Sequence, residues 1–91
     1  MRSELPELAE NLTLSPWRSS FRLSAETSGD VGGLIYALTY HVFRDLRGNV
    51  HGLSARSRKA GAAVDVYFAS RNGIDLEEAR REVQRWRMKC G

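Results

Sequence analysis

The side chains that could perform acid–base or metal chemistry are few and far apart in this sequence. His41 and His51 stand ten residues apart, and the single cysteine, Cys90, lies next to the last residue. This spacing matches no metal-ligand motif. No G-x-S-x-G or H-E-x-x-H sequence occurs, and no histidine or asparagine is placed to activate the cysteine. We therefore expect no metal, no cofactor and no enzymatic activity, with Cys90 as a free surface thiol.

A glycine-rich segment, TSGDVGG at residues 27–33, precedes a long apolar run. A phosphate-binding loop of the Walker type needs Lys and Ser or Thr after its last glycine, but Leu34 and Ile35 stand there. The glycine spacing does not match a dinucleotide-binding fingerprint either, and Asp30 would place a negative charge where a phosphate belongs. We predict that Asp30 caps a helix. The two glycines after it then allow close packing on a strand or, as the alternative, the approach of a ligand to the backbone.

The basic residues are mostly arginines, twelve of 14, and the formal net charge is +3. The planar guanidinium group suits carboxylates and phosphates. Arg56, Arg58 and Lys59 stand close together in ARSRKAG. They could contact phosphates or an acidic protein patch, or they could keep an edge strand from pairing with other molecules. Both interpretations stay open.

The spacing of apolar residues predicts the main elements. Ser20–Thr27 alternates apolar and polar residues, as a half-buried strand does. Asp30–Leu46 has apolar residues at helical spacing. A last helix begins at its N-cap Asp75, with Glu78 placed to complete a capping box. We expect the apolar stripe of this helix, which includes Trp86, to be buried.

Val50–Arg58 and Ala62–Ser70 predict a hairpin with a two-residue turn, at Ala60-Gly61 or at Gly61-Ala62. Either turn gives the same two faces. The residues expected on the core side are Leu53, Ala55, Ser57, Val64, Val66 and Phe68. The residues expected on the outward side are Arg56, Arg58, Asp65 and Tyr67.

The segment before the first of these strands is predicted from weaker signals. Ser3 can cap a short helix that runs to about Leu12, and Pro16 indicates a turn after it. NLTL, at residues 11–14, is also a candidate for a fourth, antiparallel edge strand.

Together these elements predict one α+β domain over residues 1–91. A short N-terminal helix precedes a split βαββα unit, which is half of a ferredoxin-like fold. The small antiparallel sheet has three or four strands. Its order is Ser20–Thr27, then Ala62–Ser70, then Val50–Arg58, and both long helices pack on one of its faces.

Two surfaces of this fold are candidates for binding. Tyr36, Tyr40, Phe43 and Arg47 form a second stripe on the central helix. This stripe is either a protein interface or a surface that the N-terminal segment covers.

The outward sheet face is the second candidate, since RNA-recognition modules stack bases on strand aromatics of such a face. Only Tyr67 fits that role, no RNP-like run occurs, and Glu26 and Asp65 on the same face are acidic. The sequence therefore favours a solvated face with a cross-strand ion pair between Asp65 and Arg56 or Arg58.

The preferred hypothesis is a non-catalytic binding module that occludes or regulates a protein partner. By analogy of size alone, it would be an inhibitor or adaptor such as phages and mobile elements encode. The expected partner-binding residues are Tyr36, Tyr40, Arg47, Arg56, Arg58, Lys59 and Tyr67. The alternatives are a nucleic-acid-binding protein that uses the Arg-rich hairpin and the sheet face, and a small basic ribonuclease.

The expected compartment is the cytosol. No apolar run approaches the length of a membrane span, and the N-terminal residues contain no apolar core of a secretory signal. A single cysteine forms no internal disulfide. We expect no membrane partner.

Overall fold

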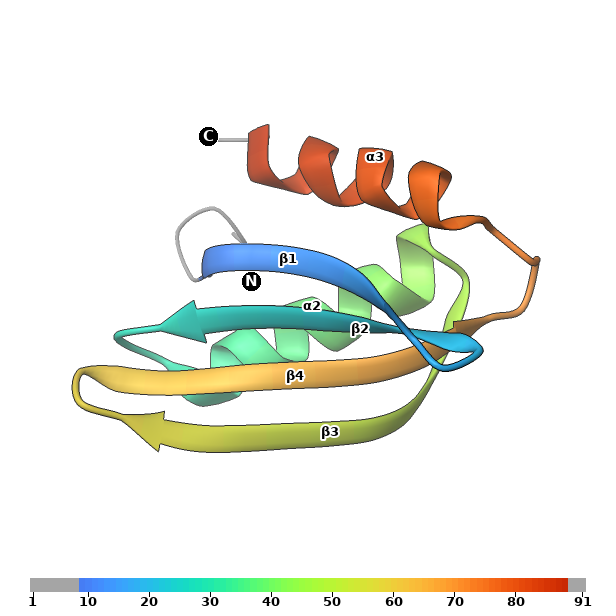
Figure 1. Ribbon diagram of the computed structural model, residues 1–91. Coiled ribbons are helices and arrows are strands. Elements are labelled where there is room, and N and C mark those ends of the chain that lie inside the picture. The colour runs from blue at the N-terminus through green and yellow to red at the C-terminus, as the bar shows by residue number, and fades with distance from the viewer. Residues whose placement is uncertain (1–8, 89–91) are drawn as a thin grey trace.

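The computed structural model describes residues 9–88, which form a four-stranded antiparallel sheet and two helices (Figure 1). The strands are β1 (Glu10–Trp17), β2 (Ser20–Thr27), β3 (Gly48–Arg58) and β4 (Gly61–Ser70), and the helices are α2 (Val31–Asp45) and α3 (Leu76–Met88). The sheet order is β1-β2-β4-β3. β2 and β3 both pair antiparallel with β4, which lies between them, and α2 connects them. The α+β class and the small antiparallel sheet are confirmed.

The order of elements differs from the expected one because the described chain begins with a strand. The predicted helix from Ser3 to about Leu12 is wrong at residues 10–12, which belong to β1, and residues 1–8 lie outside the described residues. Leu12 and Leu14 are buried while Thr13 between them is exposed, which is the alternation of a strand. β1 pairs with β2 at Glu10 and again from Thr13 to Trp17, with a register shift between Glu10 and Thr13. The candidate edge strand at residues 11–14 is confirmed.

Pro16 does not mark the turn that was predicted there. It lies within β1, opposite Phe21 of β2. An edge strand tolerates a residue without an N–H group, because its outer side has no ladder hydrogen bond to lose. The chain turns at residues 18–19 instead, with Arg18 at a φ of 58°.

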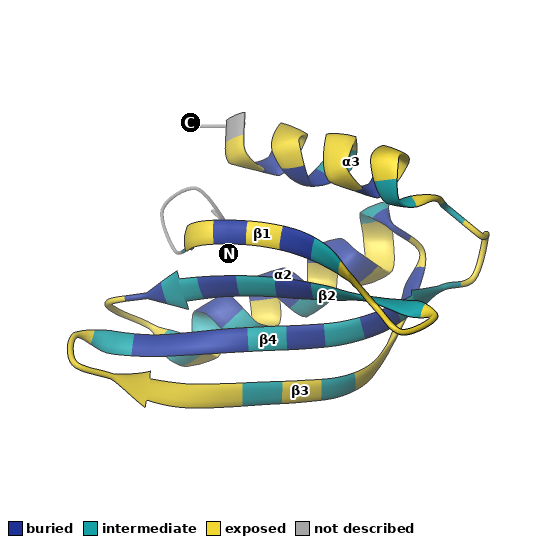
Figure 2. Cartoon of the chain, in the orientation of Figure 1, coloured by how far each residue is buried: buried dark blue, intermediate teal, exposed yellow. Residues whose placement is uncertain are grey.

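Both helices pack on the same face of the sheet, as predicted, so that the core lies between the two layers. In the view of Figure 1, α2 lies behind the sheet and α3 runs beside β1. Burial alternates along the central strands of the sheet, as Figure 2 shows. The sheet contributes the buried residues Leu12, Leu14, Leu23, Ala25, Val64, Val66 and Phe68, and the helices contribute Leu34, Ala37, Leu38, Val42, Ala79, Val83 and Trp86.

The glycine-rich segment is the start of α2. The Oδ1 atom of Asp30 accepts a hydrogen bond from the Gly33 N–H group at 2.9 Å, so the predicted cap is confirmed. A Cβ atom on Gly33 would lie 2.5 Å from the other carboxylate oxygen of Asp30. Glycine at this position therefore leaves room for the capping carboxylate, which offsets its low helix propensity.

The turn between β3 and β4 consists of residues 59–60, because Arg58 pairs with Gly61. Both predicted turns, Ala60-Gly61 and Gly61-Ala62, therefore lie too close to the C-terminus. Gly61 has a φ of 131°, and a Cβ atom on it would collide with the backbone of Thr27, so only glycine fits there. The observed strand pairing is shifted from each of the two predicted pairings by an even number of residues, so the predicted faces of the hairpin are correct. Leu53, for example, opposes Val66 on the helix side.

β3 is exposed along most of its length, although half of its side chains point to the helix side (Figure 2). α2 covers it at Gly48, where a Cβ atom would lie 2.7 Å from a side-chain carbon of Val42. Leu53, expected in the core, is 45% exposed, and Ala55 and Ser57 are exposed as well. The prediction gave the direction of these side chains correctly but not their burial.

The last helix starts as predicted, with the Glu78 N–H group donating to Asp75 Oδ1 at 2.8 Å. Trp86 is 4% exposed, and its ring centroid lies 5.1 Å from that of His41 on α2. Trp86 therefore holds α3 against α2.

Replacing Trp86 with alanine should lower the free energy of unfolding by about 3 kcal/mol or more, because it leaves a cavity between the helices. Urea denaturation followed by circular dichroism measures the change. Gln84→Ala, at an exposed position of the same helix, is the control and should change stability by less than about 0.5 kcal/mol. Equal effects of the two substitutions would contradict the buried position of Trp86.

Candidate nucleic-acid interface

The face of the sheet that no helix of residues 9–88 covers carries a cluster of aromatic and basic side chains beside the β1–β2 turn. The rings of Trp17 and Tyr67 lie with centroids 5.2 Å apart and tilted by 59°. The guanidinium carbons of Arg18 and Arg22 lie 5.6 Å and 5.5 Å from the centroid of the Trp17 ring. We call these four residues the aromatic cluster. Trp17 is 37% exposed, so part of its ring surface is open to a ligand.

Strand pairing brings the cluster together. Arg22 of β2 lies directly opposite Tyr67 of β4, and Trp17 opposes Ser20 at the end of the β1–β2 hairpin. On its other side Tyr67 opposes Gly52 of β3, where a Cβ atom would lie 3.4 Å from the Tyr67 ring. The missing side chain at Gly52 keeps that side of the tyrosine ring uncovered.

The β3 ladder is irregular beside this glycine, between Val50 and Gly52. The bulged residue, His51, reaches across the sheet, and its Nε2 atom lies 3.4 Å from Ser20 Oγ. His51 therefore belongs to the same end of the sheet face as the aromatic cluster.

Ion pairs and hydrogen bonds occupy the other half of this face. Ser24 Oγ donates to Asp65 Oδ1 at 2.5 Å, and Arg56 Nη2 lies 3.8 Å from Asp65 Oδ2. Arg58 Nη2 lies 3.6 Å from Glu26 Oε2. The predicted pair between Asp65 and an arginine of the hairpin is confirmed for Arg56. These groups line a shallow concavity of about 380 Å³ that extends to Arg22.

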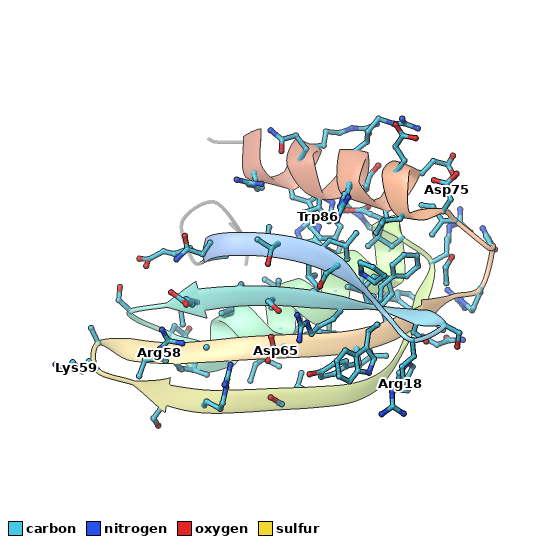
Figure 3. All side chains as sticks on the ribbon, in the orientation of Figure 1. Arg18, Arg58, Lys59, Asp65, Asp75 and Trp86 are labelled. Carbon is cyan, nitrogen blue, oxygen red and sulfur yellow. The ribbon has the colours of Figure 1, made fainter. Side chains whose placement is uncertain are left out.

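The arginines of this half keep free hydrogen-bonding capacity. The side chains of Arg56 and Arg58 are 67% and 53% exposed, so most of their N–H groups face solvent. Figure 3 shows Arg58 and Lys59 near the β3–β4 turn, Asp65 near the middle of the sheet and Arg18 at the opposite end. The face thus has an aromatic end and a basic end, with a polar concavity between them.

Arg22 has a further unused donor. Its Nε atom is buried and has no hydrogen-bond partner among residues 9–88. A buried donor without an acceptor costs free energy, which an acceptor atom of a bound ligand would recover.

The residues expected to bind one partner together lie on different sides of the molecule. Arg56, Arg58 and Tyr67 point outward from the sheet. Tyr36 and Tyr40 lie on α2, in the layer behind the sheet, stacked with centroids 6.1 Å apart. The two remaining residues of that set are exposed: Lys59 lies in the β3–β4 turn, and Arg47 follows α2.

The aromatic stripe of α2 is largely exposed in the part of the chain that the structure describes. Tyr36 is 59% exposed, Phe43 60% and Tyr40 37%. The alternative, in which the N-terminal segment covers this stripe, concerns residues 1–8, which lie outside the described residues.

Trp17 and Arg18 were missed as site residues because their segment was interpreted as a turn. A signal was present: Thr13, Ser15 and Trp17 alternate with Leu12 and Leu14, so they belong to the outward face of a strand.

The two histidines lie in separate surroundings. His41 is buried on α2 behind the sheet, whereas His51 is exposed on β3. Among residues 9–88, no group of three or more His, Cys, Asp or Glu side chains could hold a metal ion. Cys90 lies outside the described residues.

His41 Nδ1 forms a hydrogen bond of 3.0 Å with Asp45 Oδ2, and Arg44 Nε donates to Asp45 Oδ1 at 2.9 Å. Partial burial raises the pKa of Asp45, but the hydrogen bonds from Arg44 and His41 outweigh it. The pKa therefore lies below the ordinary value of 3.8. A carboxylate with a lowered pKa stabilises the fold above its ordinary pKa and loses this effect as the pH falls through its folded-state pKa.

No family model, no curated protein and no solved structure matches this chain. Within residues 9–88, no helix is long and apolar enough to cross a membrane.

Asp45→Asn should lower the free energy of unfolding at neutral pH by about 1 kcal/mol, the size of a hydrogen bond to a charged group near the surface. The difference from wild type should shrink as the pH falls below the ordinary carboxyl pKa of 3.8, because the wild-type carboxylate then becomes protonated. Urea unfolding at a series of pH values measures it. Glu77→Gln, at an exposed position, is the control. A difference that stays constant across the whole acid range would contradict this role of Asp45.

Proposed function

We propose that this protein binds single-stranded nucleic acid on the uncovered face of its sheet. The observation that carries the proposal is the Trp17–Tyr67 ring pair, flanked by Arg18 and Arg22, on a face that neither helix covers. Sheet faces bind single strands by stacking unpaired bases on aromatic side chains, and arginine adds cation–π contacts.

The basic end of the face supports the same proposal. Arg56, Arg58 and Lys59 can contact phosphates while bases stack at the aromatic cluster. Arg58 stands nine residues before Tyr67 in the chain, but it opposes Gly61, six strand positions from Tyr67. At about 3.3 Å per residue the two sites are roughly 20 Å apart along β4, a path that several nucleotides can span.

A single strand fits better than a duplex. Stacking on Trp17 and Tyr67 needs a base whose face is free, which duplex bases are not. The mild net charge of +3 also supports a binder that depends on stacking as well as on phosphate contacts.

A different protein is the second candidate partner, and the exposure of Tyr36 and Phe43 on α2 favours it. Occlusion or regulation of that protein would then use the helix layer rather than the sheet face. Because the two candidate surfaces lie on opposite sides of the domain, substitutions can test them separately. The ribonuclease hypothesis predicts cleavage of an RNA probe in the same binding assay, and the cytosol stays the expected compartment.

Trp17→Ala and Tyr67→Ala should each weaken binding of a fluorescein-labelled oligouridine by about 5- to 150-fold, since stacking on one aromatic side chain is worth about 1–3 kcal/mol. Fluorescence anisotropy at low salt measures the affinity, and Trp17→Phe should retain most of it. Tyr36→Ala, an aromatic substitution on the opposite side, is the matched control and should bind as wild type does. The proposal fails if wild type does not bind the probe, or if Trp17→Ala and Tyr36→Ala behave alike.

Replacing Arg56, Arg58 and Lys59 together with serine should reduce the salt dependence of binding. Each lost phosphate contact lowers the slope of log K against log salt by about 0.7 for a single strand. The melting temperature should change little, because exposed charges contribute little to stability. A triple replacement of Arg81, Arg85 and Arg87 on α3 removes the same charge elsewhere and should leave the slope nearly unchanged. Equal slopes for the two triple variants would mean that the hairpin touches no phosphate.

A further inference from the structure

The polar concavity of the open sheet face lies directly beside the aromatic cluster. Arg22 belongs to both, because it lines the concavity while its guanidinium carbon lies 5.5 Å from the centroid of the Trp17 ring. Asp65, which also lines the concavity, stands two residues before Tyr67 on the same face of β4 (Figure 3). At about 3.3 Å per residue, these two positions are roughly 7 Å apart along the strand.

This spacing suits two neighbouring nucleotides of a single strand, whose unstacked bases can be splayed apart. A base stacked on the aromatic cluster brings the next base within reach of the concavity. The volume of the concavity, about 380 Å³, lies within the range of roughly 300–1,000 Å³ for small-molecule sites. Thr13, Ser24 and Ala63 are among its lining residues, and their short side chains leave space above the sheet.

Asp65 keeps an acceptor atom available in this concavity. It lies between Ser24 of β2 and Ser54 of β3, which oppose it in the two ladders. Ser24 Oγ donates to Asp65 Oδ1 at 2.5 Å, a length typical of a hydroxyl bonded to an ionised carboxylate. The other oxygen, Oδ2, receives no hydrogen bond from residues 9–88, and Arg56 Nη2 lies 3.8 Å from it. An ionised carboxylate only accepts hydrogen bonds, so Oδ2 can take a donor from a ligand.

Glu26, the second carboxylate that lines the concavity, is placed differently. It opposes Ala63, four residues before Tyr67, so it lies farther from the aromatic cluster than Asp65 does. Its side chain is 36% exposed, whereas that of Asp65 is 14% exposed. Water can therefore satisfy the oxygens of Glu26, while Asp65 depends more on partners within the site.

Arg56 connects the choice of base to the phosphate contact. Its side chain is 67% exposed and can form paired hydrogen bonds with a phosphate. Such a contact would draw its guanidinium group away from Asp65. Asp65 Oδ2 would then lack its cation in a site largely shielded from water, and an unpaired acceptor there costs free energy. A donor on the bound base removes this cost.

From this available acceptor beside the aromatic cluster, we infer that the concavity selects a base with an exocyclic amino group, of which cytosine is the smallest, over uracil. The N4 amino group of cytosine donates to Asp65 Oδ2, whereas uracil presents the acceptor O4 at the same position. Two acceptors that face each other form no hydrogen bond, so uracil leaves Asp65 unpaired. The inference rests on the proposed binding of single strands and adds the base that is preferred.

Fluorescence anisotropy at low salt with labelled oligocytidine and oligouridine of equal length tests this selection. Wild type should bind oligocytidine at least about ten-fold more tightly, because a hydrogen bond to a charged group is worth that factor or more. A third probe carries 2-pyrimidinone, which lacks only the amino group of cytosine, and should lose this advantage without any change in the protein. Equal affinities for oligocytidine and oligouridine, or for oligocytidine and the third probe, overturn the inference.

Asp65→Asn should bring the ratio of the cytidine and uridine affinities to about one, because its amide can donate to uracil as well as accept from cytosine. Glu26→Gln removes the same charge from the same concavity and is the matched control, which should keep the wild-type ratio. Circular dichroism establishes that both variants are folded. If Asp65→Asn weakens both probes equally and keeps the wild-type ratio, Asp65 has only a structural role and the inference is wrong.

The same measurements separate this inference from the proposed function. If wild type binds both probes equally and Trp17→Ala weakens both, the sheet face binds single strands but the selection is wrong. If wild type binds neither probe, the proposed function and the inference both fail.

Discussion

The alternation of side chains along β4 decides the layout of the whole molecule. Val64, Val66 and Phe68 are completely buried, while Asp65 and Tyr67 point to the opposite face. Since β4 is hydrogen-bonded to a strand on both sides, its alternation fixes the faces of β2 and β3 as well. A shift of one residue in either ladder would turn apolar side chains to solvent and charged ones to the core. The side on which both helices pack, and therefore the side left open, follows from this one strand.

The open face does not contribute large apolar side chains to the core, which leaves its residues available for binding. Without a ligand, Arg56 and Arg58 lie within 4 Å of Asp65 and Glu26, which offset their charge. A phosphate group would compete with these carboxylates for the same guanidinium groups. Electrostatic attraction alone would therefore give modest affinity, and the aromatic end has to supply a share of the binding free energy. The Trp17–Tyr67 pair is thus more informative about function than the number of arginines.

Periodicity in the sequence was enough to predict β2, α2, the β3–β4 hairpin and α3, because each has a repeated local pattern or a cap. It failed before residue 13, where Leu12 suits the apolar stripe of a helix as well as the inner face of a strand. Pro16 reinforced the error, because its tolerance in an edge strand depends on the strand order. Trp17 was lost from the candidate site for this reason. The exposure of Leu53 depends on which strands the helices cover, a property of the assembled fold that no local pattern contains.

The position of α3 explains why β3 is left uncovered. Strands lie about 4.8 Å apart, so the outer strands of a four-stranded sheet are roughly 14 Å apart, whereas packed helix axes are about 8–10 Å apart. Two helices can cover such a sheet when they are centred on it. Here α3 lies at the β1 edge, where Arg80 reaches the Leu14 carbonyl, and Trp86 holds α2 beside it. The helix layer is therefore displaced toward β1. The uncovered width falls on β3 and the adjoining flank of α2, which explains why Val50 and Leu53 stay exposed although they oppose buried residues of β4.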